Sequence, residues 1–166
     1  MSAISSFELK RPAWQTAIIF ILGFWLSASL ILDLVIMPGL YASGMMVQAG
    51  FASTGYVIFW IFNRIELLCA AVVLTGALVL DRTHDLPGNQ NRKAIFLSSI
   101  LLVVALVCTY VLTPHMSALG LNLNLFAPVA EVPGTMNALH ESYWILEVLK
   151  LLVGGTMLSL CYRQKV

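Results

Sequence analysis

Four long runs of apolar residues decide what this chain can fold into. They cover about residues 14–37, 56–80, 94–113 and 138–161. An α-helix rises about 1.5 Å per residue, so about 20 residues cross a bilayer's hydrocarbon core of about 30 Å. The first run is too long for the core of a signal peptide, so we expect it to be retained. The sequence predicts an all-α membrane protein, a single domain over residues 1–166 formed by a four-transmembrane-helix bundle.

The composition excludes a water-soluble fold. Of the 166 residues, 60% are hydrophobic and only 10% are charged, whereas a soluble domain carries about 25% charged residues. The formal net charge is +1 and no basic stripe is present, so we expect no nucleic-acid partner. We expect most of the chain to lie within the lipid bilayer.

The basic residues predict the orientation. Four crossings bring the following Lys and Arg residues to one side of the membrane: Lys10, Arg11, Arg82, Arg92, Lys93, Arg163 and Lys165. The other two connections, residues 39–55 and 114–137, contain neither Lys nor Arg. The positive-inside rule then places both termini in the cytoplasm. We expect a multi-pass protein of a bacterial inner membrane or its equivalent.

Proline residues predict where two of the helices end. Pro38-Gly39 is expected to end the first helix and Thr113-Pro114 the third, because proline lacks an N–H and clashes with the preceding turn. The two outer connections are apolar enough to rest on the membrane surface or to fold over the bundle as lids. The sequence shows no internal repeat.

Five charged side chains lie well inside the apolar runs: Asp33, Arg64, Glu66, Glu147 and Lys150. A charge at bilayer depth costs a few kcal/mol or more unless it is paired or hydrated, so such residues are candidates for function. Counted along the helices, all five lie about 17–30 Å from the inner end of their run. The sequence therefore predicts a polar site in the outer half of the bundle.

Helical periodicity predicts which of these side chains can meet. One stripe of the last run, expected to face the interior, carries His140, Tyr143, Glu147, Lys150 and Gly154. One face of the second run carries Asn63, Glu66 and Ala70. The predicted network of ligand-binding or ion-binding residues consists of Asp33, Asn63, Arg64, Glu66, Tyr143, Glu147 and Lys150.

These angular positions predict three pairings of charged side chains. Lys150 is expected to pair with Glu147, three residues away, and with Glu66 of the second helix. Arg64 is about 200° from Glu66 on the same helix, so it needs another partner. We expect it to pair with Asp33, or to extend outward to the interface. The alternative to a functional role is that the paired charges only fix the packing of the helices.

A metal site is a second possibility at the outer end. His115, Met116 and His140 gather there with other methionines. Thioether and imidazole ligands suit copper, and two facing histidines can ligate a haem iron. The alternative is that the methionines are apolar filling and that His140 is an interfacial residue at a helix start. No nucleophile elbow, zinc-protease motif or phosphate loop is present, so we predict no catalytic residue.

Three segments carry a family resemblance. They are Val-Ile-Met-Pro-Gly-Leu-Tyr at 35–41, Thr-Pro-His-Met-x-x-Leu at 113–119 and Met-Asn-x-Leu-His-Glu-Ser-Tyr at 136–143. The chain resembles the four-helix membrane family called domain of unknown function 4149, which includes transmembrane-protein-205-like proteins. That family is similar to the CopD copper-resistance membrane domain and, more distantly, to the HemJ-type protoporphyrinogen oxidases. The resemblance implies this topology and, through CopD, copper handling at the outer face.

A HemJ-type oxidase would have a histidine in the first span. This chain has none there, which argues against that function.

The leading hypothesis is a non-enzymatic membrane protein that binds or passes a small ligand or metal ion, with copper as one candidate, at the outer polar site. The competing hypothesis is an accessory or scaffold subunit, as a homo-oligomer or within a larger membrane complex. A haem-binding oxidoreductase ranks third.

Overall fold

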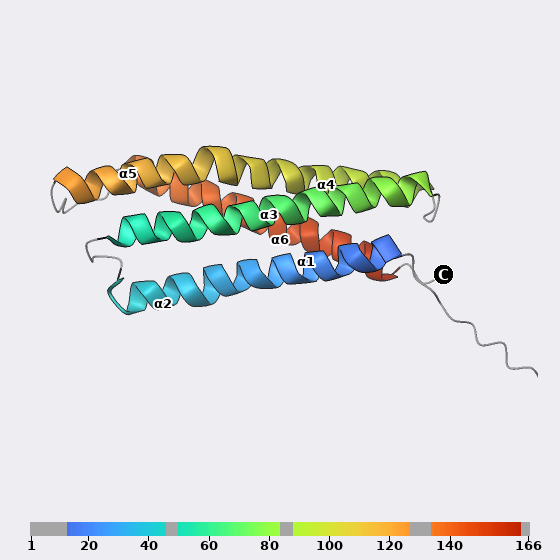
Figure 1. Cartoon of the computed structure of the whole chain (residues 1–166), viewed down its shortest axis with the longest axis horizontal. Coiled ribbons are helices and arrows are strands. Elements are labelled where there is room, and N and C mark those ends of the chain that lie inside the picture. The colour runs from blue at the N-terminus through green and yellow to red at the C-terminus, as the bar shows by residue number, and fades with distance from the viewer. Residues whose placement is uncertain (1–12, 46–49, 84–87, 127–133, 164–166) are drawn as a thin grey trace, which may run out of the picture.

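The computed structural model describes residues 13–45, 50–83, 88–126 and 134–163. Within those ranges the chain is almost entirely helical and contains no strand. It forms four long rods that run in alternating directions and lie side by side (Figure 1). Each rod is long and apolar enough to cross a membrane. The predicted four-helix membrane bundle is therefore confirmed.

Two of the rods consist of several helical segments in succession. The first rod contains α1 (Ala13–Ile31), η1 (Leu32–Ile36) and α2 (Met37–Ala42). The second is the single helix α3 (Phe51–Arg82), which Gly50 precedes with a φ of 90°, a conformation that glycine adopts readily.

The other half of the chain repeats this alternation. The third rod contains α4 (Gly88–Val107), η3 (Cys108–Leu112) and α5 (Thr113–Phe126). The fourth is the single helix α6 (Gly134–Arg163).

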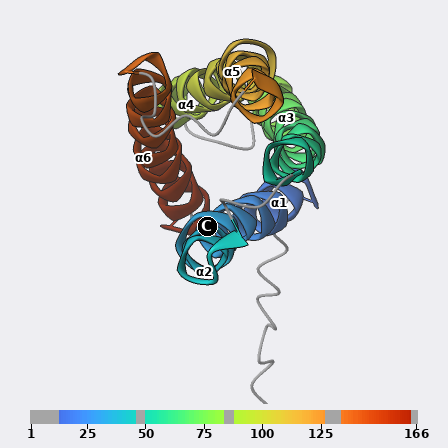
Figure 2. The same ribbon diagram turned by 90° about the vertical axis from the view of Figure 1, so that its left-hand side faces the viewer.

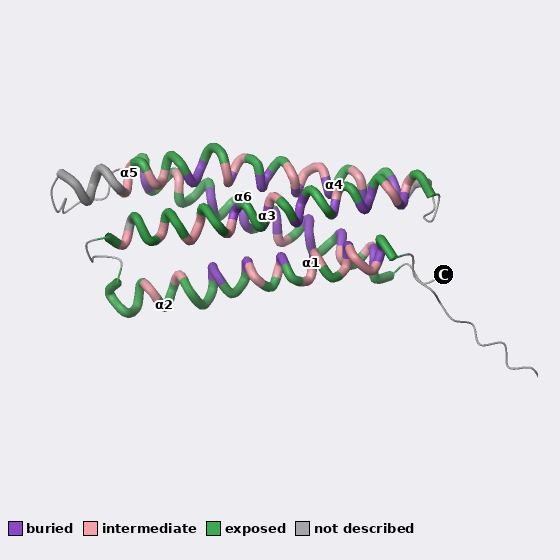
Figure 3. The backbone as a smooth tube through the Cα atoms, in the orientation of Figure 1, coloured by how far each residue is buried: buried purple, intermediate pink, exposed green. Residues whose placement is uncertain are grey.

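The rods form a ring in the order α1, α3, α4, α6, as the view along the bundle shows (Figure 2). Each rod packs against its two neighbours, and the backbones of opposite rods stay apart. Buried residues lie along the inward sides, whereas α2 has no buried residue (Figure 3). A polar side chain that reaches the opposite rod must therefore cross the axis of the bundle.

The inner half of the axis is filled by an apolar cluster. Ile18, Leu22, Val73, Leu101 and Met157 belong to it, and each is almost completely buried. The outward sides are also apolar, as expected for helices that face lipid rather than water. Phe20, Leu68, Phe96 and Leu152 are among these exposed side chains.

Exposed aromatic residues mark the two ends of the bundle. Trp14 and Tyr162 lie at one end, and Tyr41, Tyr56 and Trp144 lie toward the other. Tryptophan and tyrosine are enriched at both membrane–water interfaces, where their amphipathic rings are stable. The positions of these rings fit a bundle that crosses one bilayer.

The two prolines do not end their helices, so that prediction was wrong. The first rod continues past Pro38 to Ala42, and the third past Pro114 to Phe126. A π-helical turn precedes each proline, and in it the N–H of Met37 bonds to the carbonyl of Leu32.

The third rod uses the same arrangement, with the N–H of Thr113 bonded to the carbonyl of Cys108. A π turn widens the helix by one residue. The wider turn makes room for the proline ring, which would clash with the carbonyl four residues earlier in a regular α-helix.

The outer connections are therefore shorter than the predicted segments 39–55 and 114–137. Their helical parts belong to the rods. Residues 46–49 and 127–133 lie outside the described residues, so the prediction of lids over the bundle stays a prediction.

Two glycines let α1 approach its neighbours closely. A Cβ atom added at Gly154 of α6 would lie 2.8 Å from Cδ2 of Leu26. One added at Gly76 of α3 would lie 2.8 Å from Cγ1 of Ile18. Small residues at such contacts are the usual means of helix association in membranes, because they allow extensive van der Waals packing.

We expect Gly154→Leu to lower the free energy of unfolding by about 1–3 kcal/mol, the usual cost of overpacking. The matched control is Gly155→Leu, because a Cβ atom at Gly155 meets nothing within 4 Å. Both changes alter helix propensity equally, so the difference reports the contact with Leu26. Thermal unfolding in detergent measures it, and equal midpoints for the two variants would contradict the close packing.

Candidate functional site

A charged centre is buried near the middle of the bundle rather than in the predicted outer half, because the rods extend further at the outer end than the apolar runs do. It contains Asp33 of η1, Glu66 of α3, and Glu147 and Lys150 of α6, with exposed fractions of 5%, 3%, 2% and 1%. Very little of their surface is accessible. Because burying an unpaired charge is costly, their stability depends on the partners they find within the protein.

Lys150 pairs with two carboxylates, as predicted. Its Nζ atom contacts Oε1 of Glu66 across the axis of the bundle and lies 2.7 Å from Oε2 of Glu147. Glu147 lies one turn away on the same helix. The ammonium group therefore links α3 to α6, two rods whose backbones do not touch.

Two residues of α1 complete the surroundings of Glu66. The Nε1–H group of Trp25 donates to Oε1 of Glu66 at 2.8 Å, and the hydroxyl of Ser29 donates to the same oxygen at 3.0 Å. Three rods thus meet at one carboxylate. Neither donor was predicted from the sequence, although Trp25, Ser29 and Asp33 recur every four residues and share one face of the first rod.

Asp33 lies on the outer side of this centre. The hydroxyl of Tyr143 donates to its Oδ1 atom at 3.2 Å. Phe59 packs edge-to-face against the Tyr143 ring, with 5.8 Å between the ring centroids, and helps to hold the phenol in place.

Arg64 does not pair with Asp33, so that prediction was wrong. Its side chain is exposed, and its guanidinium group lies over the Trp60 ring, 4.0 Å from the centroid. The reason is angular, because the side of α3 that carries Arg64 is turned away from the inward-facing Glu66. Arg64 lies about 27 Å along α3 from Arg82, near the outer interface. The position of Arg64 therefore agrees with the predicted alternative, in which its side chain extends outward.

Asn63 belongs to a second polar cluster rather than to the charged centre. Its Nδ2 atom donates to the hydroxyl of Thr113 at 2.5 Å and to the carbonyl oxygen of Cys108 at 3.4 Å. The hydroxyl of Thr109 lies 3.4 Å from the carbonyl oxygen of Asn63. Asn63 thus ties α3 to the π turn η3 of the third rod.

The three predicted metal ligands do not form a centre. His115 and His140 are exposed and Met116 is half-buried. Nδ1 of His140 lies 2.9 Å from the carbonyl oxygen of Met136. Among the described residues, no group of three or more His, Cys, Asp or Glu side chains could hold a metal ion. The geometry thus gives no support to a copper or haem site.

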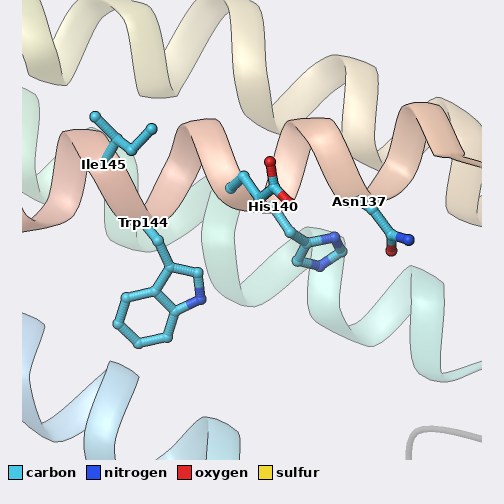
Figure 4. A pocket seen from close by; sticks show the side chains of 5 residues that line it. Asn137, His140, Trp144 and Ile145 are labelled. Atoms are coloured by element: carbon cyan, nitrogen blue, oxygen red, sulfur yellow. The ribbon is translucent and has the colours of Figure 1, made fainter.

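His140 lies at an open hollow on the surface of α6. Asn137, His140, Glu141, Trp144 and Ile145 line it, and their side chains project from one stretch of the helix (Figure 4). Aromatic and polar groups of this kind are typical of the membrane interface.

No protein-family model matches the chain, and no curated protein or solved structure is significantly similar to it. The resemblance to the family called domain of unknown function 4149 therefore stays a prediction. The charged centre has to be interpreted from its own geometry.

We expect Lys150→Met to destabilise the protein by about 3–5 kcal/mol, the usual cost of leaving a buried partner charge uncompensated. Arg64→Met is the matched control, because Arg64 is exposed and forms no ion pair with the charged centre among the described residues. It should change stability little. The measurement is thermal or denaturant unfolding of the purified protein in detergent. Equal losses for the two variants would show that Lys150 does not hold the rods together.

Proposed function

We propose that this chain is a multi-pass membrane protein that binds and passes a small inorganic cation at its buried charged centre. One observation carries the proposal. Three carboxyl groups, Asp33, Glu66 and Glu147, are buried there with one ammonium group, Lys150. When all four are ionised, the centre carries more negative than positive charge.

This imbalance favours a cation. Lys150 compensates one carboxylate, and in a medium of low dielectric constant any remaining negative charge is costly. A bound cation or proton lowers that cost. The available groups are carboxylate and hydroxyl oxygens, which prefer hard cations, whereas copper prefers sulfur and imidazole. As they stand, the described carboxylates do not form a group that could hold a metal ion, so the centre suits a proton, or a hard cation that draws these oxygens together, better than copper.

The order of the groups along the axis supports entry from the outer side. Glu66 and Lys150 lie near the middle of α3 and α6. Asp33 and Tyr143 lie on the outer side of the cluster, whereas the apolar cluster around Leu22 and Met157 fills the inner half. Passage beyond the centre requires these apolar side chains to separate.

A scaffold role is the second candidate, and one observation favours it. Lys150, Trp25 and Ser29 together satisfy Oε1 of Glu66, which ties three rods into one unit. A protein that uses its charges only to fix this packing would pass no ion.

Ion flux separates the two candidates. We expect vesicles containing the purified chain to pass at least one of H⁺, Na⁺, K⁺ or Cu⁺ under an imposed potential. Asp33→Asn should reduce the flux by about tenfold or more, because it removes a charge that binds the ion. Glu141→Gln is the matched control, since it neutralises an exposed carboxylate of α6. Vesicles that pass none of the four ions would reject the proposal in favour of the scaffold.

We also propose that both termini lie on the cytoplasmic side of a bacterial inner membrane or its equivalent. Arg82 and Arg163 end their helices at the same end of the bundle. The rule that basic residues stay inside supports this orientation.

The orientation can be measured with single cysteines, because Cys69, Cys108 and Cys161 are buried. In intact cells, a membrane-impermeant maleimide should label Tyr41→Cys but leave Arg82→Cys unlabelled until the cells are permeabilised. Both positions are exposed in the structure. The reverse labelling pattern would overturn the orientation.

A further inference from the structure

One oxygen atom of the charged centre has no donor. Oε2 of Glu147 lies 2.7 Å from Nζ of Lys150. Oε1 of the same carboxyl group is also buried, and within the described part of the chain it has no hydrogen-bond partner. An ionised carboxyl group that is cut off from water needs donors or counter-charges at its oxygens, because an unsatisfied buried charge is costly. Glu147 has such a partner at only one of its two oxygens.

The carboxylate of Glu66 has many more donors. Its Oε1 atom contacts Nζ of Lys150 and accepts hydrogen bonds from Trp25 at 2.8 Å and from Ser29 at 3.0 Å. Charge-assisted hydrogen bonds of this kind stabilise the ionised form of the acceptor. Lys150 carries a single positive charge. It compensates the charge of Glu66 and therefore leaves an ionised Glu147 without a full counter-charge.

A proton satisfies Glu147 where a larger cation does not. Because Oε1 is buried, no water-sized sphere can touch it. A metal ion requires several ligand atoms around it, and the described His, Cys, Asp and Glu side chains form no such group. A proton needs one lone pair and no additional space. It also converts the carboxylate into a neutral acid, which lowers the cost of burial to that of an ordinary polar group.

We propose that Glu147 is the proton carrier of the charged centre, and that the cation passed by this protein is the proton. This inference rests on the proposed function of the same centre. Uptake forms one O–H bond at Oε1, with a hydronium ion as the proton donor and water as the product. Release is the reverse step and needs no further reactant.

Asp33 lies further outward than Glu147. Gln15 of α1 donates to the carbonyl oxygen of Cys161 of α6 at 2.7 Å, so these two residues mark the same level near the inner end. At about 1.5 Å per residue, Asp33 lies about 27 Å beyond this level and Glu147 about 21 Å. A proton that enters from the outer side therefore reaches Asp33 before Glu147.

The centre thus has a fixed part and an exchanging part. Lys150 and Glu66 form the fixed part, and Glu147 is the exchanging part. Protonation of Glu147 changes the charge of the centre without breaking the contact that joins α3 to α6. The titratable groups around Glu147 come from its own helix, from α3 and from both π turns: Lys150, Tyr143, Glu66, Asp33 and Cys108.

Infrared spectroscopy of the full chain, over a pH series upward from neutrality and in a detergent without carbonyl groups, tests the inference. Exposed carboxyl groups are ionised there. We expect the carbonyl-stretch band of a protonated carboxylic acid, which weakens as the pH rises because the carrier loses its proton. In the unmodified protein, ¹³C labelling of glutamate should shift the band and ¹³C labelling of aspartate should not. The absence of the band, a band of constant intensity, or a band that only aspartate labelling moves would overturn the proposal.

The variants identify the glutamate. Glu147→Gln should abolish the band. Glu147→Asp keeps an acid at this position, so the band should then respond to aspartate labelling instead. Glu141→Gln is the matched control, because it removes an exposed carboxyl group of the same helix, and it should retain the band. Asp33→Asn should retain it as well. A band that survives Glu147→Gln, or that stays sensitive to glutamate labelling in Glu147→Asp, would overturn the assignment.

The spectrum and the flux measurement fail independently. A glutamate-sensitive band in a protein whose vesicles pass no ion would uphold the proton on Glu147 and reject the transport function. Flux of Na⁺, K⁺ or Cu⁺ without flux of H⁺ would overturn the proton as the cation and leave transport standing. Proton flux that Glu147→Gln abolishes and Glu141→Gln retains would support the two together.

Discussion

The ion pair between Lys150 and Glu66 is the interaction on which the rest of the structure depends. It crosses the axis of the bundle and joins α3 to α6, whose backbones have no contact. Lipid supplies no hydrophobic force that drives helices together, so van der Waals packing and polar contacts between the helices determine how the rods assemble. Trp25 and Ser29 add α1 to the same carboxylate. Without this pair the four rods would keep only their neighbour contacts.

Much of the centre could be predicted from spacing along the helices. The stripe on α6 brought Lys150 to Glu147 and Glu66, as the structure has it. The depth count placed the charges too far toward the outer side, because the rods continue beyond the apolar runs there. Angles within one helix do not fix the rotation of another helix about its axis. For this reason the predicted pairing of Arg64 with Asp33 failed, and Tyr143 was not assigned to Asp33. Trp25 was not predicted because tryptophan counts as one more apolar residue in the run. Its contribution comes from the indole N–H, which donates to Glu66.

The ends of the rods show a different limit of prediction. Proline normally ends a helix, and no residue type in the sequence predicts a π turn. The cost of the wider turn is offset by tertiary contacts such as those of Asn63 with Thr113 and the Cys108 carbonyl. Those contacts join segments far apart in the sequence. They become visible only once α3 lies beside η3.

The π turns also have a consequence for the phase of the rods. A π turn contains one residue more than an α-helical turn, so the sequence pattern beyond it is out of phase by about 100° with the pattern before it. In the first rod this change of phase falls at η1, between the inward-facing stripe of α1 and the exposed segment α2. Deleting one residue from η1 would therefore turn it into a regular α-helical turn and leave both α1 and α2 facing as they do now. The position of Asp33 in the sequence is thus fixed by helical phase as well as by depth.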